Sequence, residues 1–162
     1  MFKQFFVALF AGLVLSLVAI GSAQAETSLG FGYDLARQLD KNQDDGQINL
    51  TTQVSVGRRS ALILGLASGE RYQVLELAFK RYNEKYLSGS FFQLGTDYWY
   101  GDKKKGAKSK LGLDLRLGYE LPVTRNLVFS GAISALYGPN NLNTNKSGEL
   151  LLRPHLGVMF HF

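Results

Sequence analysis

Most of the chain distributes its residues onto two faces with a period of two. The clearest stretch is 110–121, where Leu111, Leu113 and Leu115 alternate with Gly112 and Asp114. A period of two places alternate residues on opposite faces of a β-strand, whereas a helix repeats every 3.6 residues or so. The pattern therefore predicts strands, and a length of 162 residues suits one domain.

Eight segments share this alternation, and none carries a charge on its apolar parity: 27–36, 47–57, 61–67, 72–80, 87–100, 110–121, 127–137 and 150–162. We predict an all-β fold, an eight-stranded antiparallel up-and-down barrel. Residues 70–86 also carry a helical apolar stripe, but without that strand the sheet would keep an open edge. Pro154 lies in the middle of a predicted strand, so we expect a bulge or a missing ladder hydrogen bond there.

Two kinds of barrel show such alternation, and three features favour a transmembrane barrel over a soluble one. The face opposite the apolar parity is sparsely charged and rich in small residues, which suits a narrow lumen better than a water-facing surface. Aromatic residues gather near segment ends, as at membrane interfaces: Tyr98, Trp99, Tyr100 and Tyr137 at one level, and Tyr119, Phe129, Phe160 and Phe162 at the other. The chain also ends on an aromatic residue of the apolar parity.

The first 25 residues read as a cleaved signal peptide. Lys3 precedes an apolar run over 5–20, and Ala23-Gln24-Ala25 supplies a cleavage site, so the predicted domain is 26–162. The alternative is a retained membrane anchor, but small residues crowd the end of the run and no positive flank follows. The chain has no cysteine, which excludes disulfides and a lipidated cysteine and suits a bacterial envelope protein.

The C-terminal segment carries a motif. Leu156, Val158, Phe160 and Phe162 share one face, and the last of them ends the chain. This ending resembles the C-terminal signal of bacterial outer-membrane β-barrels, and size and pattern resemble the small OmpA/OmpX-type barrels. The resemblance implies an outer-membrane location and recognition by the barrel-assembly machinery. We expect no peptidoglycan-binding domain beside the barrel, so the resemblance does not carry that function over.

Charged residues on the other parity would face the lumen: Asp34, Glu76, Lys80, Asp97, Asp114, Arg116, Glu120 and Arg153. Unpaired buried charges are costly, so we expect these acids and bases to pair. A structural network of salt bridges that fills the lumen is the favoured interpretation. A gate or a proton path is the alternative.

His155 raises the question of catalysis. Neighbouring strands offer Ser130 or Ser134 and Asp114 at similar height, which is the residue set of a Ser-His-Asp hydrolase. Against this, all three would face the lumen, where an acyl chain has poor access. We therefore expect no catalytic residues, and we expect His161 to be solvated near the periplasmic end.

Two outer loops could bind ions. Lys103, Lys104, Lys105, Lys108 and Lys110 crowd one predicted loop, where the accessible polyanion would be lipopolysaccharide phosphate rather than nucleic acid. The alternative is a solvated hairpin tip. Residues 40–46 are acidic, but their spacing fails that of an EF-hand, so no metal site is predicted.

The expected function is that of a non-catalytic, monomeric outer-membrane barrel with a side-chain-filled lumen. It would act in envelope structure or surface interaction through its outer loops, with membrane lipid and lipopolysaccharide as partners and with no cofactor. A lipid A-modifying hydrolase or acyltransferase and a narrow pore are the alternatives.

Overall fold

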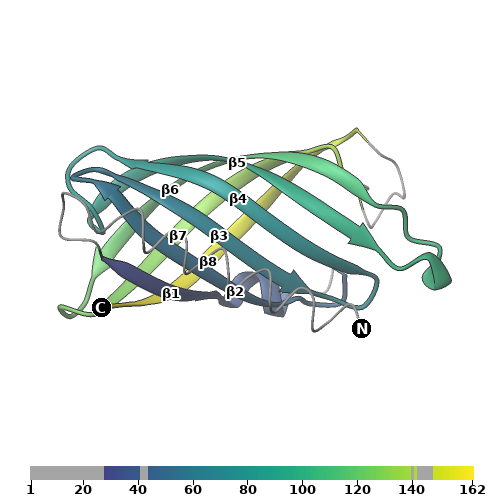
Figure 1. The fold of residues 1–162 in the computed structure, drawn as a ribbon, viewed down its shortest axis with the longest axis horizontal. Coiled ribbons are helices and arrows are strands. Elements are labelled where there is room, and N and C mark those ends of the chain that lie inside the picture. Colours follow the sequence, from purple (N-terminus) through teal and green to yellow (C-terminus); the bar gives the residue numbers. More distant parts are fainter. Residues whose placement is uncertain (1–27, 41–43, 140, 142–147) are drawn as a thin grey trace.

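A computed structural model describes residues 28–40, 44–139, 141 and 148–162. These residues form a closed barrel of eight antiparallel strands, each paired with the next along the chain and the last with the first (Figure 1). The predicted signal peptide lies outside the described residues. Among the described helices, none has the length and apolar character needed to cross a membrane.

The strands agree with the predicted segments to within two residues at each end: β1 (Leu29–Asp34), β2 (Ile48–Gly57), β3 (Ser60–Ser68), β4 (Tyr72–Tyr82), β5 (Gly89–Gly101), β6 (Lys110–Pro122), β7 (Leu127–Tyr137) and β8 (Leu150–His161). The predicted barrel is confirmed. The ambiguous segment 70–86 contains strand β4, because pairing with β3 and β5 satisfies its backbone along its whole length.

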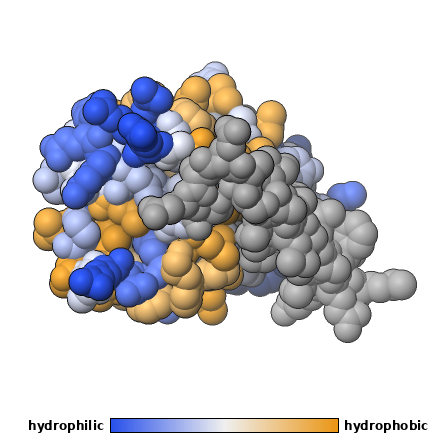
Figure 2. All heavy atoms as spheres, turned by 60° about the vertical axis from the view of Figure 1, so that its left-hand side comes forward, coloured by the Kyte–Doolittle hydropathy of each residue, from blue (hydrophilic) through white to orange (hydrophobic). Residues whose placement is uncertain are grey.

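The apolar parity faces outward on strands β4 to β8. Exposed side chains there include Leu77, Leu94, Leu113, Ile133 and Leu152. Figure 2 brings forward the end that carries the C-terminus. Hydrophobic residues (orange) cover much of its visible wall, and hydrophilic residues (blue) gather toward that end. The outside of these strands is therefore an apolar surface.

Two apolar clusters fill the lumen at different heights. One contains Tyr72, Val74 and Trp99 near the ends of the strands that meet the β5–β6 loop, and the other contains Tyr82 and Phe91 near the opposite end. Trp99 is 1% exposed, so its predicted place in an outer aromatic belt is wrong. Its position in β5 has the inward parity, whereas its neighbours Tyr98 and Tyr100 point outward.

Beyond the end of β1, the strand pairing that closes the barrel has a break between β8 and β2, which we call the wall break. Strand β1 ends at Asp34, and the short helix α2 (Leu35–Leu39) follows and packs against both β8 and β2. Because β1 pairs with β8 only as far as Gly157, residues 150–156 of β8 face no strand on that side in the described part. The predicted first strand, 27–36, therefore ends two residues too late, at Ala36 rather than Asp34.

The predicted bulge at Pro154 is absent, since the β7–β8 register runs without a shift past Ile133 and Pro154. Pro154 lies within the part of β8 that has no β1 partner. A proline is tolerated there for the same reason that it is tolerated on an edge strand.

Candidate functional site

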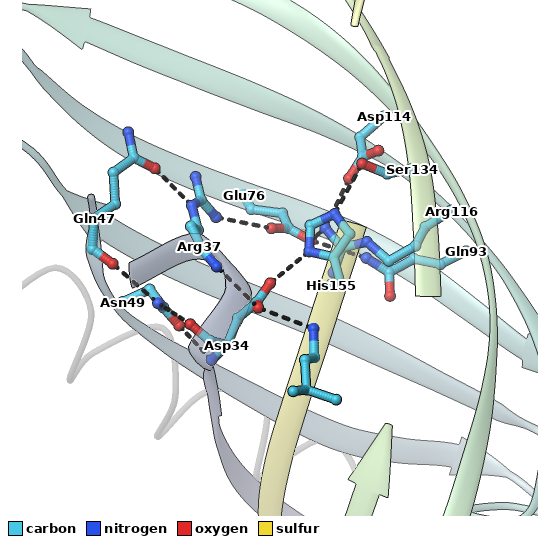
Figure 3. A network of polar contacts seen from close by, with 11 residues as sticks. Asp34, Arg37, Gln47, Asn49, Glu76, Gln93, Asp114, Arg116, Ser134 and His155 are labelled. Atoms are coloured by element: carbon cyan, nitrogen blue, oxygen red, sulfur yellow. Dashed lines mark hydrogen bonds and ion pairs between the residues drawn. The ribbon is translucent and has the colours of Figure 1, made fainter. Parts of the chain in front are cut away.

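A cluster of charged side chains occupies the middle of the lumen, close to α2 (Figure 3). Glu76 on β4 is its centre: Arg116 Nη2 donates to Glu76 Oε1 at 3.2 Å, and Arg37 Nη1 lies 3.7 Å from Oε2. Arg116 also donates to Asp114 Oδ2 at 2.8 Å. The pairs join strands β4 and β6 across the lumen and tie α2 to the opposite wall.

Two members of this cluster, Arg37 and Gln93, were not predicted. Arg37 lies just beyond the first predicted strand, 27–36, yet its side chain is buried and its Nε donates to Gln47 Oε1 at 2.6 Å. Gln93 Nε2 donates to Glu76 Oε1 at 2.8 Å. Gln93 has the lumen parity and could have been found from it, but only the turn of α2 brings Arg37 inward.

A second charged group lies lower in the lumen. Lys80 Nζ donates to Glu120 Oε1 at 2.7 Å and to Gln53 Oε1 at 2.9 Å, while the Tyr82 hydroxyl donates to Glu120 Oε2 at 2.8 Å. Gln53 Nε2 donates to the Tyr82 hydroxyl at 2.9 Å, which closes the ring of contacts. Lys80 also lies over the ring of Phe91, 4.4 Å from its centroid.

The remaining predicted lumen charges are placed differently. Arg153 lies over the ring of Trp99, 4.7 Å from its centroid, and forms no ion pair within the described residues. Asp97, Glu76 and Asp114 bring carboxylate oxygens within 4.8 Å of one another. Arg37 and Arg116 neutralise part of this acidic group.

Three side chains form a hydrogen-bonded relay on neighbouring strands. Ser134 Oγ on β7 lies 2.9 Å from His155 Nε2, and His155 Nδ1 lies 2.5 Å from Asp34 Oδ2. With the imidazole proton on Nδ1, the ring donates to the carboxylate and accepts from the hydroxyl. The hydrogen-bonded order of the three groups is that of a Ser-His-Asp triad.

The acid of the relay differs from the one considered in the sequence analysis. Asp114 pairs with Arg116, and Asp34 takes the place next to the imidazole. Backbone N–H groups of Arg37 and Leu156 each donate to Asp34 Oδ1 at 3.2 Å, so the carboxylate is held by the start of α2 and by β8.

Register explains which serine takes part. On one side of β8, Ser134 pairs with Arg153, and on the other side Asp34 pairs with Gly157. His155 lies between Arg153 and Gly157 along β8, so it is diagonal to both Ser134 and Asp34. Ser130 lies against Gly157 instead, where a Cβ at the glycine would overlap its Oγ.

The end of the barrel near the C-terminus holds a buried histidine. His161 is 3% exposed, so the expectation of a solvated residue is wrong. Its Nδ1 lies 3.4 Å from Ser28 Oγ, and its ring packs edge-on against Tyr86, 5.9 Å between centroids. Burial raises the pKa of Tyr86 to about 12, because the phenolate would be poorly hydrated there.

The predicted lysine loop connects β5 and β6. Lys103–Lys105 form the 3-10 turn η1, which Asp102 caps by accepting from Lys104 N at 2.9 Å. The side chains of Lys103, Lys104, Lys105 and Lys108 are exposed, and Lys110 begins β6. Lys105 pairs with Glu70 at 3.3 Å, which joins this loop to the β3–β4 loop.

A surface hollow separates these two loops. It is lined by Arg71, Tyr72, Tyr100, Lys103 and Lys104, among others. On its inner side, buried Asp44 accepts from the backbone N–H groups of Arg71 and Tyr72 at 2.8 and 2.7 Å. Asp44 thus acts as an anchor for the β3–β4 loop.

The four residues of the C-terminal motif point outward or lie at the chain end. Leu156, Phe160 and Phe162 are exposed and Val158 is half-buried. The Phe162 ring packs edge-on against Phe160 and Phe31, with centroids 5.0 and 6.3 Å apart. The terminal aromatic therefore sits on the β1–β8 seam that closes the barrel.

Comparisons with protein-family models, with curated proteins and with solved structures found no match to this chain. The resemblance to OmpA/OmpX-type barrels stays a prediction.

Proposed function

We propose that the protein is an integral barrel of the bacterial outer membrane, exported by a signal peptide over 1–25, with a lumen closed to solutes. The observation that carries this proposal is the inverted distribution of polarity. Leucines such as Leu111, Leu113 and Leu117 are exposed on the outer wall, while Glu76 and Lys80 are buried inside. Water disfavours that arrangement and a hydrocarbon surrounding favours it.

Aromatic residues support the same orientation. Tyr98, Tyr100 and Tyr137 are exposed near one end of the barrel, and Tyr119 and Phe160 near the other. Amphipathic rings at two levels are typical of the two interfaces of a membrane. The outward C-terminal residues suit recognition by the barrel-assembly machinery during insertion.

The proposed partner at the outer surface is lipopolysaccharide. Arg71, Lys103 and Lys104 line one hollow above the outward-facing Tyr98 and Tyr100. Guanidinium and ammonium groups bind phosphate through charge-assisted hydrogen bonds. The protein would thus act in envelope structure or surface interaction as a monomer, without a cofactor.

Cell fractionation with gel analysis tests the membrane assignment. We expect the protein in the outer-membrane fraction, with faster migration in unboiled than in boiled samples, because a closed barrel resists detergent until heated. A protein in the soluble periplasmic fraction that migrates identically with and without boiling contradicts the proposal.

A further inference from the structure

We propose that Ser134, His155 and Asp34 form the catalytic relay of an esterase that cleaves long-chain acyl esters. These substrates would enter laterally from the lipid bilayer, through the wall break beside α2. This activity goes beyond the proposed function. The non-catalytic interpretation of the sequence depended on poor access to the lumen, and the wall break offers a lateral route once α2, which occupies it, shifts.

The relay is already arranged for nucleophilic attack. The Ser134 hydroxyl donates to His155 Nε2 at 2.9 Å, which is the distance expected between a nucleophile and its general base. Asp34 fixes the opposite ring nitrogen and is itself held by two backbone N–H groups. The imidazole therefore has one tautomer and one orientation, as a general base requires.

Access to the relay comes from the side of α2. The side chains of His155 and Asp34 are 9% and 14% exposed, whereas Ser134 as a whole is 1% exposed. Beyond Asp34 no strand of the described residues seals β8 on that side, and Pro154 lacks the N–H that would help another strand to pair there. For an ester carbonyl to reach Ser134 by this route, the five residues of α2 would move outward. That movement breaks the Arg37–Glu76 contact and leaves the Leu156 N–H to hold Asp34 Oδ1.

The surroundings of the break select an apolar acyl chain. Exposed leucines lie on each element that borders it: Leu39 on α2, Leu50 on β2, and Leu152 and Leu156 on β8. A barrel in a membrane would present these residues to lipid, so the acyl chain of a lipid ester could remain in an apolar environment while its carbonyl enters the break.

Arg116 supplies a donor for the charge that develops during the reaction. It faces Ser134 directly across the β6–β7 pair, and its buried Nε has no hydrogen-bond partner among the described residues. A buried N–H with no ground-state partner can donate to an oxyanion, and such donors stabilise acyl-transfer intermediates.

The reaction takes two steps and consumes water. Ser134 Oγ attacks the ester carbonyl as its proton passes to His155 Nε2; the C–O bond breaks, and the alcohol leaves with that proton. His155 then takes a proton from water, whose oxygen attacks the acyl-serine. The bond to Ser134 breaks, the serine regains its proton, and a carboxylic acid is released.

Covalent labelling of the full-length barrel in detergent micelles tests the relay independently of membrane location. A long-chain alkyl fluorophosphonate should modify Ser134, as peptide mass analysis would show. Ser134→Ala should abolish labelling, and His155→Ala should slow it by at least about a hundredfold, the usual contribution of a positioned base. Ser130→Ala, on the same strand and the same face, should label like the native chain.

Heat-modifiable gel migration of every variant distinguishes a substitution that prevents folding from one that removes catalysis. Asp34→Asn provides a second variant that keeps the side-chain shape. Its labelling should fall although the barrel stays closed. If the folded native barrel is not labelled at Ser134, or if folded Ser134→Ala labels equally, the relay is a structural latch between β7, β8 and β1 and the proposal is wrong.

Chain length and lipid source test the substrate class. In micelles, p-nitrophenyl palmitate should be cleaved faster than p-nitrophenyl butyrate, and equal or faster cleavage of the butyrate overturns the long-chain assignment. Fatty acid release from reconstituted vesicles of phospholipid alone, compared with vesicles that also contain lipopolysaccharide, identifies which lipid supplies the ester. Release from neither contradicts delivery from the bilayer.

Discussion

At the scale of single residues, the buried Lys80–Glu120 pair shows how the lumen tolerates charge. Each of its side chains has a second partner, Gln53 for the ammonium and Tyr82 for the carboxylate. Burying an isolated ion is strongly unfavourable, but a pair with all its hydrogen bonds satisfied offsets much of that penalty. The pair therefore matters chiefly because losing one member leaves the other uncompensated.

Lys80→Met should lower the free energy of unfolding by about 3–5 kcal/mol, because it leaves Glu120 as a buried anion without its cation. Urea titration of the barrel in detergent, with heat-modifiable gel migration as the measure of the folded fraction, determines this change. The double variant Lys80→Met with Glu120→Gln should recover part of the loss, and exposed Lys108→Met should change little. A loss of the same size in the Lys108 variant would contradict the explanation.

At the scale of elements, close packing between β6 and β7 depends on which face a glycine occupies. A Cβ at Gly118, on the lumen face, would lie 2.6 Å from Ala132 Cβ and from the carbonyl oxygen of Gly131. A Cβ at Gly131, on the outer face, would meet nothing within 4 Å. The same residue type therefore has different roles at two neighbouring positions of one strand pair.

Gly118→Ala should destabilise the barrel by about 1–3 kcal/mol, the usual cost of overpacking, because backbone atoms obstruct the new methyl group. Gly131→Ala is the matched control and should be neutral or stabilising by up to about 1 kcal/mol, since it reduces the freedom of the unfolded chain. Unfolding midpoints in urea compare the two. Equal destabilisation by both would show that the predicted clash is not the cause.

The β5–β6 loop allows a test of the lipopolysaccharide proposal. Replacing Lys103, Lys104, Lys105, Lys108 and Lys110 by Ser should weaken lipopolysaccharide co-purification while the barrel still folds. The difference from the native chain should shrink as salt rises, because exposed charges are screened beyond about 8–10 Å at physiological ionic strength. Lys105→Ser alone should have a smaller effect, because this lysine already pairs with Glu70. Unchanged co-purification would show that the loop is a solvated hairpin tip that does not bind lipopolysaccharide.

At the scale of the whole molecule, the lumen is filled rather than open. The cluster around Trp99 and Tyr72 and the cluster around Tyr82 and Phe91 lie at different heights, and the paired charges of Glu76 and Lys80 lie on the same inward face of β4. Eight strands enclose an interior that side chains can just fill. Charged groups within it bind one another, as Arg116 does with Asp114 and Lys80 with Glu120.

Purified barrel in planar bilayers should therefore show small or no ion conductance. The double variant Trp99→Ala with Tyr82→Ala truncates two side chains that fill the lumen, so it should raise conductance if the barrel stays closed. Leu113→Ala on the outer wall is the control. A steady porin-sized conductance from the native protein would mean that the lumen is not filled as described.

Local sequence patterning was enough to predict the strands and the face on which each residue lies. Period-two alternation is local, so it located all eight strands and predicted the burial of charges such as Glu76 and Asp114. It failed where a local pattern continues but the structure changes, as at Leu35, which keeps the apolar parity yet begins α2. It also misplaced Trp99, whose residue type suggested an interface although its parity pointed inward.

Which inward side chains meet depends on how the sheet closes, which no local pattern reveals. Contact between Ser134 and His155, and between His155 and Asp34, depends on the stagger of β7 against β8 and of β8 against β1. That stagger is set when the whole sheet closes, and it joins residues as far apart as 34 and 155. Alternation fixes the face of each residue but not its height on the barrel, so the sequence could name the residue types of the relay and still choose the wrong acid.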